Sequence, residues 1–449
     1  MSATRVTTDD ALLASQQQRT LGETVSDYFK RLRGGDLGAL PIIVGLAIIA
    51  AIFQGQNENF LSNRNFVNLV LQMAGITVIA IGVVYVLLLG EIDLSIGYVS
   101  GVSGVLMTWL LKGGLTPFSV IGNLLTFLGV DVEKIGWLTT TLDPQPWYVA
   151  IPIALIVAAL IGLLHGTIIT RFQLPAFIVT LAGLLAWNGV VLLLVGEGGT
   201  IVLQDPVALG IANSYFGDGT AKGVVLSSTW AWVSVGLMVI LFAAAQFAQI
   251  ANRRRQNLPH TPFIFVILQT LLVAAAAIGV TYVCLQDRGL PVIGLIMIVL
   301  LAIFTYIATS TKFGRYVYAV GGNKEAARRA GVRVERIRIY VFMISSLMAG
   351  AGGLVLASRL RSVATDAGGG NLVLNSIAAA VIGGTSLFGG SGKVSSALLG
   401  ALVVASVENG MGLLGLSSGV KFIITGLVLL VAVLVDSISR SSQSKSGLK

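Results

Sequence analysis

Long runs of apolar residues, separated by short polar segments, dominate the pattern along the chain. A helix needs about 20 predominantly apolar residues to cross the hydrocarbon core of a bilayer. About twelve segments approach that length: residues 40–53, 66–89, 98–111, 147–170, 174–195, 230–250, 263–285, 290–309, 337–357, 372–388, 394–413 and 420–435. The runs are continuous rather than alternating, which excludes an outer-membrane barrel. The pattern predicts an all-α polytopic integral membrane protein with about 12 transmembrane helices.

Composition agrees with this prediction. Of 449 residues, 55% are hydrophobic and 11% are charged, whereas about 25% are charged in an ordinary soluble domain. A soluble monomer is therefore excluded. The single cysteine, Cys284, lies inside an apolar run, so neither a disulfide framework nor a thiolate metal cluster is expected. The two histidines, His165 and His260, lack the spacing of metal ligands, and we expect no metal site.

The net charge of +9 raises the question of nucleic-acid binding, and the placement of the charges answers it. If the N-terminus is cytoplasmic, about 21 of the 29 Lys and Arg fall in loops on the cytoplasmic side. The loops left outside, 112–146 and 196–229, carry mixed or acidic charge. This is the distribution of the positive-inside rule. It predicts that both termini are cytoplasmic, and it leaves no reason to expect a nucleic-acid partner.

The predicted organisation is an N-terminal cytoplasmic extension over residues 1–36, a transmembrane domain over 37–437 and a cytoplasmic tail over 438–449. The extension lacks the apolar core and cleavage site of a secretory signal. Residues 21–32 within it are compatible with an amphipathic helix on the membrane surface and equally with a disordered tail.

The chain offers no ATP-binding chemistry of its own. Lys393, the only lysine after a glycine in a glycine-rich context, is followed by Val394, and Leu387 stands where a phosphate loop has its first glycine. We therefore expect no catalytic residues and no cofactor bound by this chain. Any energy must come from a partner protein or from an ion gradient.

Very few charges are expected inside the hydrocarbon, and the clear candidates are Glu91, Asp93 and Glu408. Ion-coupled pumps usually need acidic or histidine relays there, so ion coupling is disfavoured. Glu91 and Asp93 belong to the segment 90–97, whose glycines, Asp93 and Ser95 are typical of a broken helix that serves as a gate. The alternative is a tight cytoplasmic turn capped by Asp93. A glycine-rich counterpart at 382–390 hints at two related halves.

The longest cytoplasmic loop, residues 310–338, has eight basic and two acidic residues. Asn323 can cap a short helix, Glu325 suits its first turn, Arg328 suits its last turn, and Gly331 can stop it. The pattern predicts a two-turn helix with Ala326, Ala327 and Ala330 clustered on one side as a docking surface for a partner protein. The alternative is a loop that merely satisfies the positive-inside rule.

Four motifs in this order carry a family resemblance: residues 91–97 (EIDLSIG), 175–183 (PAFIVTLAG), 314–323 (GRYVYAVGGN) with 326–327 and 331–332, and 382–386 (IGGTS). They resemble permeases of ATP-binding-cassette (ABC) importers of the ribose/xylose/arabinose class, over residues 60–436. The extra central pair of spans around residues 253–255, with segments 287–291 and 358–360, is most similar to the D-xylose branch, which includes permeases for multiple monosaccharides.

The resemblance implies a bacterial inner-membrane permease that imports a monosaccharide by alternating access. Its partners would be a second permease copy, ABC ATPase subunits (two copies or a fused double cassette) that hold ATP and Mg²⁺, a periplasmic or lipid-anchored sugar-binding protein, and membrane lipids. The predicted ATPase-coupling residues are Gly322, Asn323, Glu325, Ala326, Ala327, Arg328 and Gly331. The predicted gate and pathway residues are Glu91, Asp93, Ser95, Thr180, Asn188, Thr385, Ser386 and Asn409. Polar groups such as Thr180, Asn188 and Asn409 equally suit simple bonding between helices.

Two other classes of function stay open at this point. An ion-coupled secondary sugar transporter would show uptake without ATP. A lipid or glycan flippase would work without soluble partners.

Overall fold

The computed structural model describes residues 40–113, 142–196, 199–218, 223–256 and 262–427, with residues 430 and 434. The predicted extension and tail lie outside these residues. The chain divides into a larger unit, which comprises Gly38–Tyr215 and Pro291–Ser437, and a smaller unit, whose described part falls within Phe216–Leu290.

The centre of the larger unit is the long helix α16 (Val334–Leu360), which packs against α4 (Asn63–Leu88), α5 (Ile96–Lys112) and α8 (Trp147–Arg171). Glycines make these crossings close. A Cβ on Gly162 of α8 would lie 2.3 Å from the carbonyl oxygen of Phe342, and one on Gly353 would lie 2.0 Å from that of Ser100. Such small-residue contacts are typical of helix packing in membranes, where no hydrophobic force drives helices together.

Shorter or more peripheral helices surround this centre. They are α3 (Leu40–Gln56), α9 (Ala176–Val195), α13 (Val292–Ser310), α17 (Leu372–Ile382) and α18 (Ala397–Leu413). The helices α17 and α18 pack on each other and on α4, α9 packs on α5, and α13 packs on α4.

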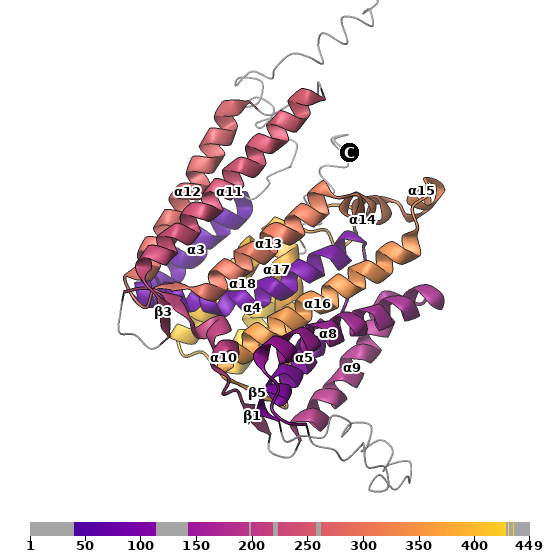
Figure 1. Cartoon of the computed structure of the whole chain (residues 1–449), viewed down its shortest axis with the longest axis horizontal. Helices are drawn as coiled ribbons and strands as arrows, with labels where there is room; N and C mark the ends of the chain where they lie inside the picture. Colours follow the sequence, from indigo (N-terminus) through magenta and orange to yellow (C-terminus); the bar gives the residue numbers. More distant parts are fainter. Residues whose placement is uncertain are drawn as a thin grey trace, which may run out of the picture. The chain divides into compact units, whose positions relative to one another are not determined.

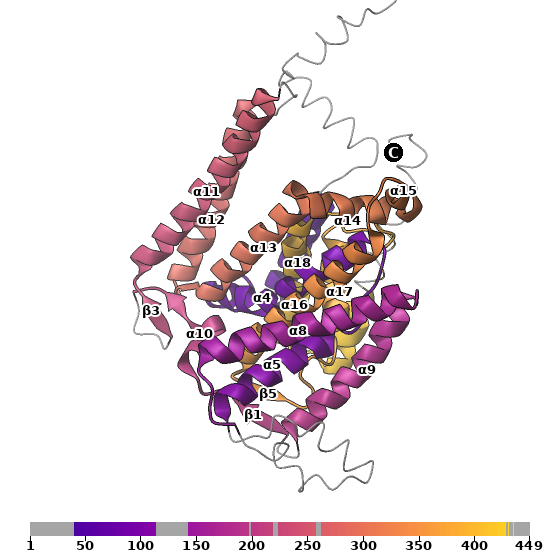
Figure 2. The same ribbon diagram turned by 45° about the vertical axis from the view of Figure 1, so that its right-hand side comes forward.

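The loops of the larger unit sort to two opposite ends (Figures 1 and 2). The short helices α14 (Lys312–Gly322) and α15 (Lys324–Arg329) lie at one end. At the other end lie α10 (Pro206–Asn213) and a two-stranded antiparallel sheet of β1 (Thr200–Val202) and β5 (Ser362–Ala364), in which Ile201 is opposite Val363. The positive-inside pattern predicts that the end with α14 and α15 is cytoplasmic.

The smaller unit is built on two packed helices, α11 (Ser228–Arg255) and α12 (Phe263–Leu285). Large apolar side chains on both are exposed, including Ile240 (65%) and Leu272 (71%). Side chains of this kind are at home in lipid and unfavourable in water. Two strands that precede the pair in sequence and one that follows it form a three-stranded sheet. Its strand order is β3 (Val224–Leu226), β2 (Tyr215–Phe216), β4 (Leu290–Pro291).

A multi-pass membrane protein is thereby confirmed. Eight of the described helices are long and apolar enough to cross a membrane, and four more apolar helices are shorter, namely Leu40–Gln56, Ile96–Lys112, Leu372–Ile382 and Ser418–Leu427. The count of twelve crossings and the cytoplasmic termini stay predictions.

Two sequence-based expectations need correction. The fold is mostly rather than wholly helical, because five short strands pair in the loops of the part of the chain that the structure describes. The predicted span 372–388 ends as a helix at Ile382, since Gly383 and Gly384 follow and Gly384 adopts φ +94°, which a helix cannot continue through.

Candidate functional site

The predicted docking helix is present as α15. The side-chain oxygen of Asn323 accepts a hydrogen bond from the amide of Ala326 at 2.9 Å and caps its N-terminus. Arg328, in its last turn, donates to Glu325 at 3.0 Å and to Glu335 at 2.9 Å, the second of these on α16. Gly331 follows with φ +83°, a conformation that glycine adopts without strain. The cap, the charges and the stop therefore lie where the sequence predicts.

The alanines of α15 divide between two sides. Ala327 is buried within its own chain, whereas Ala326 and Ala330 are exposed. A partner protein can therefore reach Ala326 and Ala330 but not Ala327. With six residues, α15 is also shorter than the two turns that the sequence predicts.

We expect Asn323→Ala to loosen α15 without unfolding the protein. A lost N-cap typically costs about 1 kcal/mol, and a six-residue helix has little else to hold it. Hydrogen exchange at the amides of 325–330 should become faster by several-fold. Asn323→Asp retains the acceptor oxygen and should keep the slow exchange; equal exchange rates in all three proteins would contradict a capping role.

The helix α14, which the sequence analysis did not predict, anchors α15. The Thr311 hydroxyl accepts from the amide of Gly314 at 3.1 Å and begins the helix. Val317 and Val320 are buried in the core. Val317 and Val320 are three residues apart, a spacing that is typical of one face of a helix. The sequence analysis considered only the basic charge around them.

Glycines join α14 to the two segments that the sequence marks as broken helices. A Cβ on Gly321 would lie 1.7 Å from the carbonyl oxygen of Leu88, at the end of α4, and 2.8 Å from the amide nitrogen of Gly390. The amide of Gly390 donates to that same Leu88 oxygen at 2.9 Å. Gly389, at φ +87°, would place a Cβ 2.8 Å from the Gly90 nitrogen. We call the contact of Gly90, Gly321, Gly389 and Gly390 the glycine junction.

Two side-chain interactions flank the glycine junction, one from α14 and one from α16. The Tyr318 hydroxyl of α14 donates to the carbonyl oxygen of Gly392 at 2.8 Å. Arg338, near the start of α16, makes an ion pair with Glu91 at 2.5 Å, and the two side chains are only 11% and 16% exposed. The helix α14 therefore contacts Leu88 and residues 389–392, and Gly389 in turn contacts Gly90.

Asp93 is the centre of a buried polar cluster. Its Oδ1 accepts from the hydroxyl and amide of Ser95 at 2.6 and 3.1 Å, and its Oδ2 accepts from the hydroxyl of Ser345 on α16 at 2.8 Å. Ser95 Oγ lies 3.2 Å from His165 Nδ1, and the indole N–H of Trp187 donates to His165 Nε2 at 3.1 Å. We call these five residues the Asp93 node.

The directions of the bonds in the Asp93 node are consistent with a neutral histidine. Nε2 of His165 accepts from Trp187, so Nδ1 carries the proton and donates to Ser95, whose own proton goes to Asp93. Every donor thereby has an acceptor. The node joins α8, α9 and α16 to the non-helical segment between α4 and α5.

Within the non-helical segment Glu91–Leu94, Asp93 is buried, Glu91 and Leu94 are half-buried, and Ile92 is exposed. Ser345, the partner of Asp93, lies about 16 Å along α16 from Val334, at 1.5 Å per residue. Irregular backbone at membrane depth occurs where it is buried in protein or lines a water-filled pathway. Ser345 holds Asp93 inside the bundle, whereas Glu91 pairs with Arg338 nearer the start of α16; the choice between a broken helix and a turn capped by Asp93 stays a prediction.

The other predicted pathway residues do not gather at one place. The Thr180 hydroxyl donates to the carbonyl oxygen of Ile92 at 3.4 Å, next to the Asp93 node. Asn409 exchanges hydrogen bonds of 2.8 and 2.9 Å with Asn65, which is typical of bonding between helices. Ser386 accepts from the amide of Phe388 at 2.9 Å within a turn. Thr385 is fully buried and Asn188 is half-buried.

Sequence reasoning missed His165, Ser345 and Arg338. His165 was judged only as a metal ligand, although a histidine inside an apolar run is itself a signal, because a polar group there needs a partner. Among the described residues, no group of three or more His, Cys, Asp or Glu could hold a metal ion.

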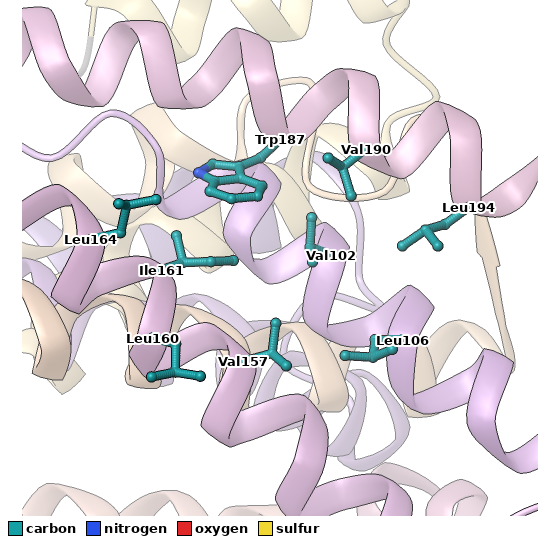
Figure 3. A pocket seen from close by; sticks show the side chains of 9 residues that line it. All are labelled: Val102, Leu106, Val157, Leu160, Ile161, Leu164, Trp187, Val190 and Leu194. Atoms are coloured by element: carbon teal, nitrogen blue, oxygen red, sulfur yellow. The ribbon is translucent and has the colours of Figure 1, made fainter. Parts of the chain in front are cut away.

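An apolar groove of about 360 Å³ lies between α5, α8 and α9 (Figure 3). Its lining is Val102, Leu106, Val157, Leu160, Ile161, Leu164, Trp187, Val190 and Leu194. The one polar atom among these side chains, the indole nitrogen of Trp187, is already bonded to His165. Such a lining suits acyl chains and offers nothing to a hydroxylated solute.

Comparison with known proteins identifies the class. A family described as "Branched-chain amino acid transport system / permease component" matches residues 65–433, and the chain belongs to this family of membrane permeases. The match confirms the resemblance given by the four sequence motifs. No solved structure matches the chain.

Several curated relatives of the chain are named as sugar permeases. The xylose transport system permease protein XylH of Escherichia coli (strain K12) is 34% identical over 94% of this chain and 97% of its own length. XylH of Haemophilus influenzae is 31% identical over 91% of the chain and 98% of its own length. The ribose import permease protein RbsC of H. influenzae is 29% identical over 88% and 91%. The chain is therefore similar to sugar permeases along nearly its whole length.

Proposed function

We propose that the protein is the membrane subunit of an ABC importer that carries a monosaccharide, D-xylose or a related sugar, into a bacterial cell. A second copy of this chain would complete the pathway, a sugar-binding protein would deliver the substrate from the outside, and ATPase subunits with ATP and Mg²⁺ would bind α15 at the cytoplasmic face of the inner membrane. The similarity to xylose permeases supports the choice of sugar.

The observation that carries the proposal is the glycine junction. The Cβ-free contact of Gly321 with Leu88 and Gly390 leaves no compressible side chain between α14 and the ends of two other segments. Atoms in such contact transmit displacement rather than absorb it, because protein interiors are close-packed. When ATP closes the ATPase pair, motion of α15 would reach Glu91 through α14 and change the access of the pathway.

A bulky residue at the exposed side of α15 should release the ATPase. We expect Ala326→Trp to weaken binding of the ATPase subunit by at least tenfold, because the small side chain lets a partner approach the helix closely. The measurement is co-purification followed by titration of the ATPase subunit onto the permease in nanodiscs. Arg171→Trp is the matched control, since Arg171 is exposed on another loop, at the end of α8, that is predicted to be cytoplasmic.

Uptake into proteoliposomes tests the activity itself. D-xylose uptake should require ATP with the ATPase subunit and the sugar-binding protein together. Uptake driven by a proton gradient in their absence would overturn the proposal and indicate a secondary transporter, and lipid translocation without soluble proteins would indicate a flippase.

A further inference from the structure

Three polar side chains from the last third of the chain belong to neither the glycine junction nor the Asp93 node. They are Arg359 on α16, Asn375 on α17 and Glu408 on α18. The side-chain amide of Asn375 donates to Glu408 Oε1 at 2.5 Å. Arg359 and Lys421 both interact electrostatically with the Glu408 carboxylate.

Glu408 and Arg359 are partly exposed in the single chain, although both lie on helices that cross the membrane. Exposure of a charged group to hydrocarbon is unfavourable, and ionisable residues in spans face the bundle interior or a water-filled cavity. The neighbouring Asn409 differs, since it is buried and bonded to Asn65. The side of α18 that carries Glu408 is therefore a hydrated or protein-covered side rather than a lipid-facing one.

The amide of Asn375 has an orientation that leaves one atom unsatisfied. A carboxylate only accepts hydrogen bonds, so the nitrogen of the amide must face Glu408. The oxygen, Oδ1, is buried without a hydrogen-bond partner among the described residues, and Asn375 as a whole is 3% exposed. A buried acceptor without a donor is unfavourable, and such a group in a native protein calls for an explanation, such as bound water, an ion or a functional role.

The chemistry of this set selects one class of ligand. It combines acceptors on Asn375 and Glu408 with a guanidinium donor on Arg359. Hydroxyl groups both donate and accept, so adjacent hydroxyls of a neutral polyol can satisfy a carboxylate, an amide oxygen and a guanidinium together. Within these three residues the formal charges of Arg359 and Glu408 cancel, so the three residues alone offer no net charge to an ionic ligand.

We propose that Arg359, Asn375 and Glu408 form a hydroxyl-binding subsite for a neutral sugar on the pathway side of α17 and α18. This inference rests on the proposed function and specifies where the sugar is contacted during passage. In this proposal the sugar is contacted by Glu408 rather than by its neighbour Asn409, which the sequence predicts as a pathway residue.

Cysteine accessibility tests the subsite without any partner protein. The chain has one cysteine, Cys284, which is buried, so Cys284→Ala gives a clean background. In membranes, Glu408→Cys should react with a charged methanethiosulfonate reagent at least tenfold faster than two control variants. Ala405→Cys places a thiol one turn away at a position 1% exposed, and Leu272→Cys places one on the apolar surface of α12.

Protection by sugar tests the ligand. Millimolar D-xylose or D-ribose should slow modification of Glu408→Cys several-fold, whereas equal leucine should not. No reaction at Glu408→Cys, or reaction at the same rate with and without sugar, would overturn the subsite. Failure of the proposed function shows separately, as the absence of ATP-dependent uptake by the unmodified protein.

Glu408→Gln provides a second measurement in case the cysteine variants do not fold. The glutamine amide can still be placed beside Asn375 but removes the negative charge that interacts with Arg359. We expect sugar uptake to fall at least tenfold while ATP hydrolysis stimulated by the binding protein stays within twofold. Equal loss of both activities in a protein of unchanged thermal stability would indicate a role in coupling and overturn the subsite.

Discussion

Alanine at Gly321 will reduce ATP-driven uptake by more than tenfold, whereas alanine at the adjacent Gly322 will leave it almost unchanged. A Cβ on Gly321 would lie 1.7 Å from the Leu88 oxygen and 2.8 Å from the Gly390 nitrogen. Both are backbone atoms, so no side chain can rotate aside, and α14 must move away from the end of α4. A Cβ on Gly322 meets nothing within 4 Å.

The two variants share composition, location and chemistry and differ only in this contact. We expect Gly321→Ala to reduce uptake by more than tenfold and to raise hydrogen exchange at residues 388–392. Binding of the ATPase subunit should persist, because α15 itself is untouched. Uptake by Gly321→Ala equal to that of Gly322→Ala would show that the glycine junction does not transmit the motion.

The sequence predicts the helices of this fold well because lipid imposes a simple rule. A spanning helix must be apolar for about 20 residues, and the described helices α8, α9, α11, α12 and α13 match the predicted runs within a few residues. The rule fails where protein rather than lipid surrounds the chain. The apolar run after Leu372 continues to Phe388, but glycine ends α17 at Ile382, and residues 383–388 form the non-helical segment that leads to Gly389 of the glycine junction.

Local motifs in the coupling loop could also be predicted from sequence. The cap at Asn323 and the stop at Gly331 depend on neighbours within a few residues, and such signals survive without knowledge of the fold. The direction in which Ala327 points could not be predicted, because it depends on the packing of α15 against the rest of the chain.

The partners of Asp93 and Glu91 could not be predicted from the sequence, because they lie far away along the chain. Asp93 bonds to Ser345, 252 residues later, and Glu91 pairs with Arg338. A serine in an apolar helix carries no mark of its role, since it bonds equally well to its own backbone. Only the crossing of α16 over the segment between α4 and α5 brings these groups together.

The two adjacent serines of α16, Ser345 and Ser346, allow the effect of the bond to Asp93 to be distinguished from the effect of any polar side chain in this helix. Ser345 donates to Asp93, and both serines are fully buried. Ser346 Oγ has no hydrogen-bond partner among the described residues. Ser345→Ala leaves one oxygen of a buried carboxylate without its donor, whereas Ser346→Ala removes an unsatisfied hydroxyl.

We expect Ser345→Ala to lower the free energy of unfolding by about 1–3 kcal/mol, the range for leaving a buried hydrogen-bonding group without its partner. Ser346→Ala should be neutral or slightly stabilising. Unfolding of the purified protein by denaturing detergent measures both. A double-mutant cycle with Asp93→Asn isolates the interaction between Ser345 and Asp93. Because the amide of Asp93→Asn already weakens the bond, Ser345→Ala should lower the free energy of unfolding by less in that background than in the unmodified protein. Additive effects, or equal effects of the two serine variants, would show that Asp93 is held by other groups and that α16 does not control the broken segment through this bond.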